Sequence, residues 1–364
     1  MAKLIEITGK ALAGEWGTDD ESGEGIPVLR TTNFTNEGTV DYNNVVTRTI
    51  IKKNLEEKYL RAGDIIIEKS GGSDKQPVGR VVYFDGPENT YLFNNFTGLL
   101  RVKEQTKWFP KYVFYSLYGN YRRGGTRPFE NKTTGLHNLK TDGYVSRYEV
   151  AETSFSKQVE ISSQLDKLHS IIKMREDEVI KLDDLIRARF VEMFGDPILN
   201  QKGFPVYRMD EIVEFQGGSQ PDKKYFEYES TDDNIRLIQI RDYKTDNYIT
   251  YIPKAMAKRF CTAEDIMIGR YGPPIFQILQ GIEGAFNVAL MKATPRQGNR
   301  EYVRWFLKQD CLLHYLEGMS KRTAGQDGIQ MDKLKTYPFP LAPKELQEQF
   351  ATFVTQVDKS KFVV

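Results

Sequence analysis

The chain has 364 residues, of which 40% are hydrophobic and 12% aromatic, and its formal net charge is +1. This length predicts two or three domains, and the apolar content excludes a disordered chain. No apolar run approaches the roughly 18 residues that span a bilayer, and the N-terminus has no signal-peptide core, so we expect a cytoplasmic protein. Cys261 and Cys311 are interpreted as small buried hydrophobes in a reducing compartment.

Residues 1–153 form a first module. Short runs rich in β-branched residues at 45–51, 64–67 and 80–83, broken by Gly, Pro and Asn, predict strands, and the segment 110–118 predicts a helix. Basic residues also gather here, because residues 111–140 carry six Lys and Arg side chains and a single acidic one, Glu130. A nearly neutral chain with a local basic stripe suits a protein that meets an anionic polymer on one face.

Residues 154–197 have a different texture, since 156–194 contain neither Gly nor Pro. Apolar side chains recur there every three or four residues, which predicts one helix about 58 Å long with a coiled-coil seam. The seam positions are Ile161, Leu165, Leu168, Ile172, Val179, Leu182, Ile186, Phe190 and Met193. A helix of this length cannot bury its stripe in one small domain, so we expect a helical partner. The alternative is an ordinary long core helix.

The chain then repeats its own pattern over 198–342 and 343–364. Residues 25–34 return as 234–243, 62–67 as 263–268, and 112–117 as 302–307. Residues 155–167 return as 346–359, with Gln158 aligned on Gln349. A repeat of this length is a duplicated domain rather than a solenoid. The copies share apolar positions and differ in polar ones, as two binding modules with one scaffold and two specificities would.

The distal segment 343–364 is the obvious partner of the long helix. Its seam residues are Leu346, Phe350, Val354 and Val357. In an antiparallel pair it would cover only the C-terminal half of the longer helix, so that Ile161, Leu165, Leu168 and Ile172 lack a partner. We therefore expect a shortened subunit, or one that is completed by another chain, and self-association through the uncovered seam.

Tandem modules, each followed by a helix that opens at 155–158 or 346–349, resemble the DNA-specificity subunit of Type I restriction–modification systems. Residues 182–197 look like the end of that family's central helix, and 339–343 like the segment that leads into its distal helix. The resemblance implies an α/β (α+β) fold with two target-recognition domains, 1–153 and 198–342. It also implies a central spacer helix, 154–197, which pairs with the distal helix, 343–364, as antiparallel coiled-coil helices.

The partners implied by the resemblance are double-stranded DNA, two modification (methyltransferase) subunits and the restriction (endonuclease/translocase) subunits. Each module would read one half of a split, asymmetric DNA site. S-adenosylmethionine, Mg²⁺ and ATP would then belong to the partner subunits, with no cofactor in this chain.

Candidate DNA contacts are Lys and Arg side chains for phosphates, and polar side chains on loops for base edges. The loop after the predicted helix offers three guanidinium groups beside flexible glycines, and the loops after residues 67 and 268 are equivalent positions in the two modules. The candidates are Lys69, Ser70, Arg122, Arg123, Arg127, Lys132, Thr133, Gln220, Lys223, Lys224, Arg270, Tyr271, Lys321 and Arg322. The alternative for each is a solvated basic or polar loop.

The sequence gives weaker support for an enzymatic function than for DNA binding. Residues 271–275 superficially resemble the catalytic loop of amino-methyltransferases, but Gly272 stands where a side chain must accept the amine hydrogen. A nuclease site at Asp64 and Glu68 is disfavoured because Gly269 replaces Glu68 in the second copy. The histidines are scattered, which disfavours a zinc site. We expect no catalytic residue and no metal. The other hypothesis is a coiled-coil-linked scaffold that binds protein or glycan.

Overall fold

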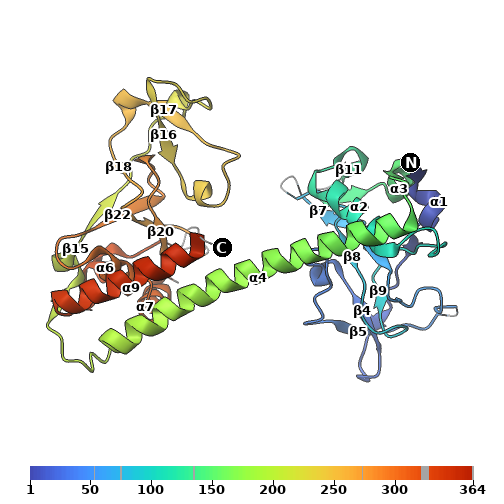
Figure 1. Cartoon of the computed structure of the whole chain (residues 1–364), viewed down its shortest axis with the longest axis horizontal. Coiled ribbons are helices and arrows are strands. Elements are labelled where there is room, and N and C mark those ends of the chain that lie inside the picture. The colour runs from blue at the N-terminus through green and yellow to red at the C-terminus, as the bar shows by residue number, and fades with distance from the viewer. Residues whose placement is uncertain (53, 74–75, 134–135, 273, 321–327, 363–364) are drawn as a thin grey trace. The chain divides into compact units, whose positions relative to one another are not determined.

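The structure is a computed structural model that describes residues 1–364 except 53, 74–75, 134–135, 273, 321–327 and 363–364. It divides into two compact units, Met1–Ile172 (unit 1) and Lys173–Val364 (unit 2). One helix, α4 (Phe155–Phe194), contains the division between them (Figure 1). The helix predicted over 156–194 is therefore confirmed. Among the described residues, none of the helices has the length and apolar character that crossing a membrane requires.

The described residues of unit 1 form short strands and, before α4, the α-helices α1, α2 and α3. Its elements are β1 (Ala2–Lys3), α1 (Leu4–Thr8), β2 (Leu12–Ala13), β3 (Thr18–Asp19), β4 (Ile26–Leu29), β5 (Val46–Thr49), β6 (Ile65–Glu68), β7 (Ser70–Gly72), β8 (Val81–Tyr83), β9 (Leu92–Phe93), β10 (Thr97–Leu100), α2 (Pro110–Arg122), β11 (Glu130–Thr133), β12 (Leu136–Leu139), α3 (Thr141–Arg147) and β13 (Glu149–Val150). The strands predicted in this unit are present as β5, β6 and β8, and the predicted helix is α2. Pro110 suits the first turn of α2, where its missing N–H costs nothing.

Unit 2 has the same plan after α4. Its elements are β14 (Val206–Arg208), α5 (Met209–Ile212), β15 (Val213–Gly217), β16 (Asn234–Ile238), β17 (Tyr251–Pro253), β18 (Phe260–Cys261), β19 (Ile266–Gly269), β20 (Gln277–Gln280), β21 (Gly284–Phe286), β22 (Leu290–Pro295), α6 (Arg300–Leu307), α7 (Asp310–Ser320), α8 (Met331–Thr336), β23 (Pro338–Pro340) and α9 (Lys344–Phe362).

The sheets confirm the duplication. The main sheet has the order β2-β10-β6-β8 in unit 1 and β15-β22-β19-β20 in unit 2. A second sheet contains one parallel pair in each unit, β4 with β9 and β16 with β21. Strands at the two ends of each module also pair, β1 with β13 and β14 with β23. Both modules are mixed helix-and-sheet folds, as predicted.

The central strand of each main sheet is buried on both faces, which explains its continuous apolar sequence. In unit 1, Ile65 and Ile67 pack into the core formed with the helices, and Ile66 packs into the core below the second sheet. In unit 2, Ile266 and Ile268 face the larger core, and Met267 faces the smaller one. One three-residue apolar run thus joins two cores in each module.

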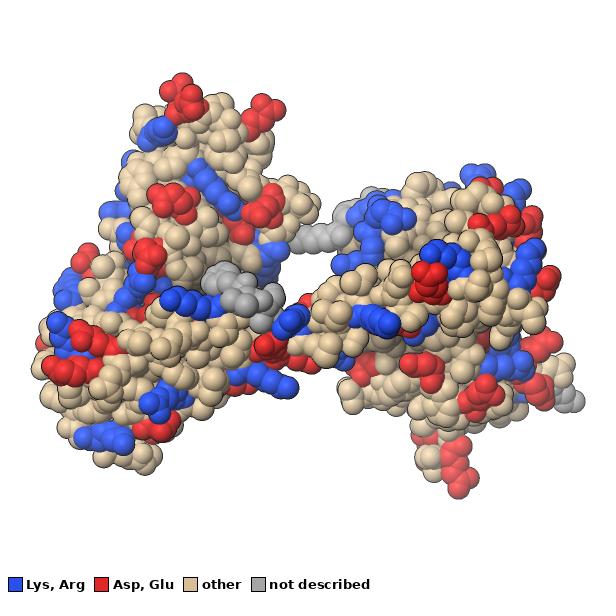
Figure 2. Space-filling view, in the orientation of Figure 1, with Lys and Arg blue, Asp and Glu red and all other residues tan. Residues whose placement is uncertain are grey.

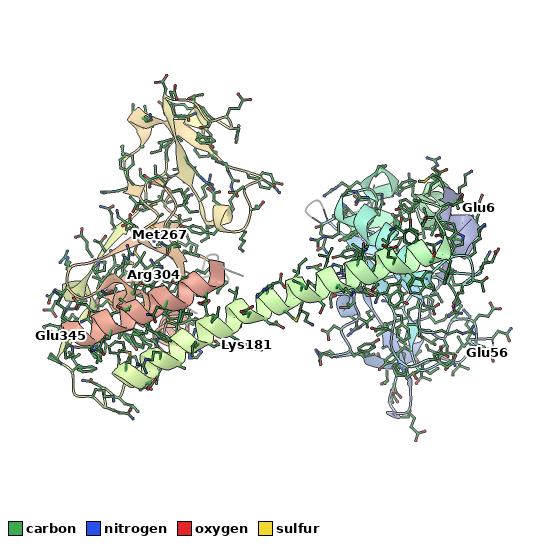
Figure 3. The ribbon with its side chains drawn as sticks, in the orientation of Figure 1. Glu6, Glu56, Lys181, Met267, Arg304 and Glu345 are labelled. Atoms are coloured by element: carbon green, nitrogen blue, oxygen red, sulfur yellow. The ribbon has the colours of Figure 1, made fainter. Side chains whose placement is uncertain are left out.

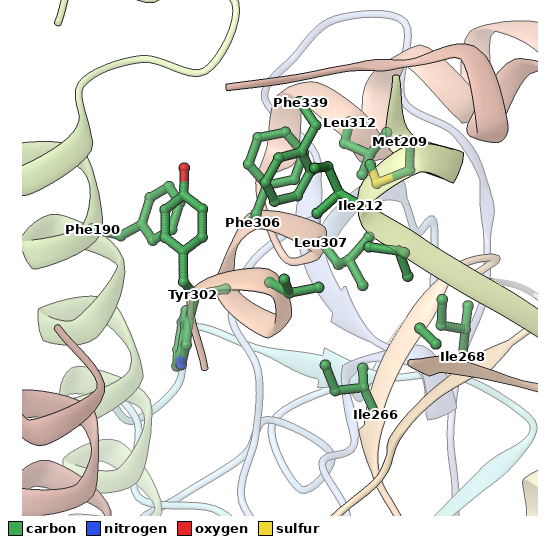
Figure 4. Close-up of a cluster of buried hydrophobic side chains, with 14 of the residues drawn as sticks. Phe190, Met209, Ile212, Ile266, Ile268, Tyr302, Phe306, Leu307, Leu312 and Phe339 are labelled. Carbon is green, nitrogen blue, oxygen red and sulfur yellow. The ribbon is translucent and has the colours of Figure 1, made fainter. Parts of the chain in front are cut away.

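Within unit 2, the end of α4 and α9 form an antiparallel pair. Phe190 lies 5.4 Å from Phe350 between ring centroids, while the earlier Asp183 bonds the later Lys361 at 2.7 Å. Phe190 also stacks on Tyr302 of α6 at 5.5 Å (Figure 4). The predicted antiparallel pairing is therefore confirmed for this half of α4. The seam residues Ile186, Val354 and Val357 are buried, and Leu182, Met193 and Leu346 are partly buried.

The other half of the seam is less covered. Ile161 and Leu165 are half-buried, whereas Leu168 and Ile172 expose 55% and 54% of their surface. Val179 is 38% exposed. The prediction that these residues lack a partner within the chain therefore fits Leu168 and Ile172 best. The domain boundaries at 153, 197 and 342 stay a prediction.

One alignment within the predicted repeat is wrong. Gln158 is buried and bonds the backbone N–H of Phe109, and the residue that does the same in the second copy is Gln347, which bonds Asn299 N–H. Gln349, the predicted counterpart, is exposed. The identical residues at Gln349 and 356–359 suggested the wrong register. The correct register is set by the one buried glutamine amide, and not by residues that are identical but exposed.

Candidate nucleic-acid interface

A glycine directly follows the first strand of the main sheet in each unit, and it lies against a backbone carbonyl. A Cβ atom placed on Gly14 would be 2.0 Å from the carbonyl oxygen of Asn94. The same atom on Gly218 would be 2.0 Å from the carbonyl oxygen of Asn287. Such a separation is a clash for any other residue, so only glycine allows the two backbone segments to approach.

The loops around these glycines have one hydrogen-bonded frame. The matching backbone bonds are Glu15 N to Phe93 O and Ser219 N to Phe286 O, Asn94 N to Leu29 O and Asn287 N to Ile238 O, and Lys69 N to Phe96 O and Arg270 N to Ala289 O. Lys69 and Arg270 therefore occupy the same place, just beyond β6 and β19. The frame is common to both units, while the side chains that it presents differ.

In unit 2 this frame brings Arg270 and Gln220 to one loop, residues 287–289. The Arg270 guanidinium donates to the carbonyl oxygen of Val288 at 3.4 Å, and the Asn287 amide donates to Gln220 Oε1 at 3.4 Å. Arg270 also lies 5.4 Å from the ring centroid of Tyr271, which is 37% exposed. Cation, amide and aromatic ring together form a polar surface that could contact phosphates and base edges.

In unit 1 the structure groups three predicted arginines at the end of α2. Arg122, Arg123 and Arg127 line a hollow of about 480 Å³ together with Gln76 and Tyr121. No carboxylate pairs with Arg122 or Arg123 within the described part of the chain. Lys and Arg side chains gather over the region of β7, β11 and α2 on the face shown in Figure 2. A guanidinium can fork onto a phosphate or a guanine edge, so this cluster suits DNA.

The remaining predicted residues are more scattered. Ser70 lies in β7 and pairs with Asn138 of β12, and Lys132 and Thr133 lie in the neighbouring β11, with side chains outside the described ones. Lys223 and Lys224 form a short 3-10 helix, where Lys224 pairs with Asp222 at 3.5 Å. Lys321 and Arg322 lie outside the described residues.

Sequence reasoning missed the frame and two exposed side chains that it carries, Phe96 (52% exposed) and Val288 (37% exposed). A signal was present, because the dipeptide Phe93–Asn94 recurs as Phe286–Asn287. The repeated dipeptide was missed because its role depends on a distant segment: Asn94 is buried, and its carbonyl contacts a glycine about 80 residues earlier in the sequence. A second missed surface in unit 2 is a hollow lined by Arg241 and three tyrosines, Tyr228, Tyr248 and Tyr251.

The carboxylates considered for a nuclease site have structural partners. Arg101 forms two hydrogen bonds with Asp64, at 2.7 and 2.6 Å, and Arg80 lies 3.6 Å from Glu68. Burial raises the pKa of Glu68, and Arg80 partly offsets that rise. His137 is buried against Glu130 at 3.1 Å, as a structural histidine would be. Within the described residues, no group of three or more potential metal ligands comes together.

Duplicated modules, an antiparallel helix pair and two equivalent loop frames with different exposed side chains define a tandem recognition protein. Residues 201–362 match the family model of the Type I restriction modification DNA specificity domain. The family match therefore covers most of unit 2, from Gln201 to Phe362. No match was found among curated protein sequences.

Solved structures match the chain at low sequence identity, and the first of those described here shares its fold. The S subunit of a Type I restriction-modification system from M. genitalium is 16% identical, with a TM-score of 0.52 over 99% of this chain and 89% of that one. The HsdS subunit from Thermoanaerobacter tengcongensis is 14% identical, with a TM-score of 0.37 over 100% and 89%. A chain from a study of type I R-M complex assembly and conformational transition is 14% identical, with a TM-score of 0.49 over 100% and 90%.

Proposed function

We propose that this chain is the DNA-specificity subunit of a Type I restriction–modification system, that it reads a bipartite, asymmetric DNA site, one half with each module, and that it is not itself catalytic. The observation that carries the proposal is the duplicated loop frame. Gly14 and Gly218 fix the same backbone geometry twice, and Lys69 and Arg270 stand at the same place with different chemistry. A shared scaffold with different exposed side chains is what two half-site specificities require.

Affinity would come from phosphate contacts, and selectivity from the side chains at the loop tips. Two modules on one chain make the second half-site contact effectively intramolecular, so two weak readers yield one selective site. The methyltransferase and restriction subunits would join this chain in the cytoplasm. They would supply S-adenosylmethionine, Mg²⁺ and ATP.

A second part of the proposal concerns α4. Leu168 and Ile172 expose more than half of their surface, and Ile171 is 48% exposed. Exposed apolar side chains on one helix favour association. In the absence of its partners, the chain would therefore associate with a second copy through this part of α4.

The test is the methylome of cells that co-express this chain with its modification subunit. We expect a split methyladenine motif, and we expect Arg270→Gln to change only one half of it. A matched triple substitution of Arg122, Arg123 and Arg127 by Gln should change only the other half. Stable co-purification with the modification subunit but no methylated motif would overturn the proposal.

A further inference from the structure

Unit 2 contains a second cationic hollow, away from the loop frame, with a volume of about 630 Å³. It lies between the end of α4, β20, α6 and α9. Figure 3 shows Arg304 on α6, beside α9. Its cations are Arg300, Arg304, Lys308, Lys359 and Lys361, and its carboxylates are Asp183, Glu301 and Asp358. Five cations stand against three carboxylates in the lining, and Glu264, outside the lining, pairs with Arg300, so an excess of positive charge remains.

Arg304 is buried without full use of its hydrogen-bond donors. Its side chain is only 12% exposed, and its Nε and one terminal nitrogen have no hydrogen-bond partner among the described residues. The other terminal nitrogen donates to Gln280, and Glu301, at 3.7 Å, is beyond hydrogen-bonding distance. A buried guanidinium with unused donors is costly unless an acceptor completes it.

Lys308 adds a second poorly matched cation. Its ammonium lies 4.3 Å from the ring centroid of Trp305, and within the described part of the chain no carboxylate lies close enough for an ion pair. Burial lowers the pKa of Lys308, and the nearby Arg304 and Lys361 lower it further, against the opposing effect of Asp183 and Asp358. Burial also lowers the pKa of Arg304. The cations in this hollow therefore repel one another in a partly desolvated place.

We propose that this hollow binds a dianionic phosphate group, with the phosphate on Arg304 and Lys308. A phosphomonoester carries about −1.5 to −2 charges at pH 7 and three acceptor oxygens, so it can accept from the unused donors of Arg304 and from Lys308 at once. Guanidinium and ammonium donors are the usual partners of phosphate oxygens. Ile278 and Val354 line the same hollow and offer an apolar wall to the organic part of a ligand. The volume lies within the range of small-molecule sites, about 300–1,000 Å³.

The test is calorimetric titration of the full chain with inorganic phosphate and with ATP, without Mg²⁺, in chloride buffer of matched ionic strength. We expect one saturable site, and Lys308→Met should weaken it at least about tenfold. Lys344→Met is the control, because this lysine is 82% exposed on the first turn of α9, outside the hollow. The control should bind phosphate like the unchanged chain.

A second measurement separates a binding role from a structural one. If Lys308 is a ligand for phosphate, Lys308→Met relieves repulsion and raises the melting temperature of the phosphate-free chain, while phosphate loses its stabilising effect. A lower melting temperature together with unchanged phosphate affinity would overturn the proposal. So would the lack of saturable binding by both probes.

Competition tests whether the site takes a free dianionic phosphate or the singly charged phosphates of DNA. If a short DNA duplex displaces ATP, and Lys308→Met weakens DNA binding in parallel, the site binds the DNA backbone and the dianionic assignment is overturned. If the duplex leaves ATP binding unchanged, the ligand is a free phosphate compound. The hollow does not depend on the loop frame. If the phosphate proposal fails, the proposed recognition of a bipartite DNA site is therefore unaffected.

Discussion

Gln158 and Gln347 form the same joint in the two copies of the module. Each amide oxygen accepts a hydrogen bond from the residue just before a module helix, Phe109 N–H at 2.9 Å before α2 and Asn299 N–H at 2.6 Å before α6. Each amide nitrogen donates to a carbonyl just before its own helix, that of Thr153 or Ala342, and the Gln158 amide also donates to the carbonyl of Lys107, before α2. One buried glutamine thus ties α4 or α9 to the module that it follows.

The first prediction concerns this joint. Gln347→Ala removes a buried amide and leaves the Asn299 N–H and the Ala342 carbonyl without their partner, so unfolding free energy should fall by about 2–3 kcal/mol. Gln349→Ala is the matched control, because it makes the same change two positions later on an exposed site. Its effect should stay within about 0.5 kcal/mol. Urea unfolding of both variants measures this, and equal losses would contradict the assigned register.

The same joint shows what the sequence can and cannot predict. The strand at Ile65–Ile67 and the helix over 156–194 were predictable because local periodicity and composition determine them. The register of Gln347 and the contact of Gly14 with Asn94 were not, because each depends on a segment distant in the sequence. Candidate DNA contacts were chosen by residue type alone, so the sequence could name Lys69 and Arg270 but not the frame that makes them equivalent.

The second prediction concerns the loop frame. In Gly218→Ala, the added Cβ would meet the Asn287 carbonyl at 2.0 Å, so the loop that holds Arg270 must move. We expect recognition of one DNA half-site to be lost, and methylation of the complete site to be lost as a result. Unit 1 should keep its stability. Gly318→Ala is the control, because nothing lies within 4 Å of a Cβ on this helical glycine and alanine favours helix. Normal methylation by Gly218→Ala would show that the frame tolerates the shift.

The third prediction separates the roles of Lys69 and Arg270. A lysine acts as a point charge, so Lys69→Gln should weaken binding to all sequences alike and reduce the salt dependence of log K by about 0.9. Arg270→Lys keeps the charge but loses the planar fork, so it should reduce discrimination at one position by about 1–3 kcal/mol with an unchanged salt slope. Salt titrations with the partner subunits present measure both. A lower salt slope for Arg270→Lys would contradict this assignment, because the substitution keeps the charge and removes only the planar fork.

The fourth prediction follows from Glu68. Burial raises its pKa above the ordinary value of 4.5 in the folded state, so the folded chain holds this proton more tightly than the unfolded chain. The resulting stability is present below the unfolded pKa and is lost as pH rises through the raised folded pKa. Glu68→Gln should therefore gain stability relative to the unchanged chain as the pH rises above the ordinary value of 4.5. Glu57→Gln, on an exposed site, should show no such trend. A parallel pH dependence of both variants in urea unfolding would refute the assignment.

The last prediction concerns the uncovered part of α4. Leu168 and Ile172 are 55% and 54% exposed, so replacing both with Gln should remove apolar surface without removing core packing. We expect the unchanged chain to show a mass that rises with concentration in light scattering, and the double variant to stay monomeric with the same circular dichroism. Ile198→Gln is the control, because this residue is 64% exposed but lies beyond the end of α4. A monomeric unchanged chain at high concentration would sink the idea, whereas association that survives the double substitution would place the contact on another surface.

Added modification subunit should compete with self-association if both use this stretch of α4, since a helix face can hold one partner at a time.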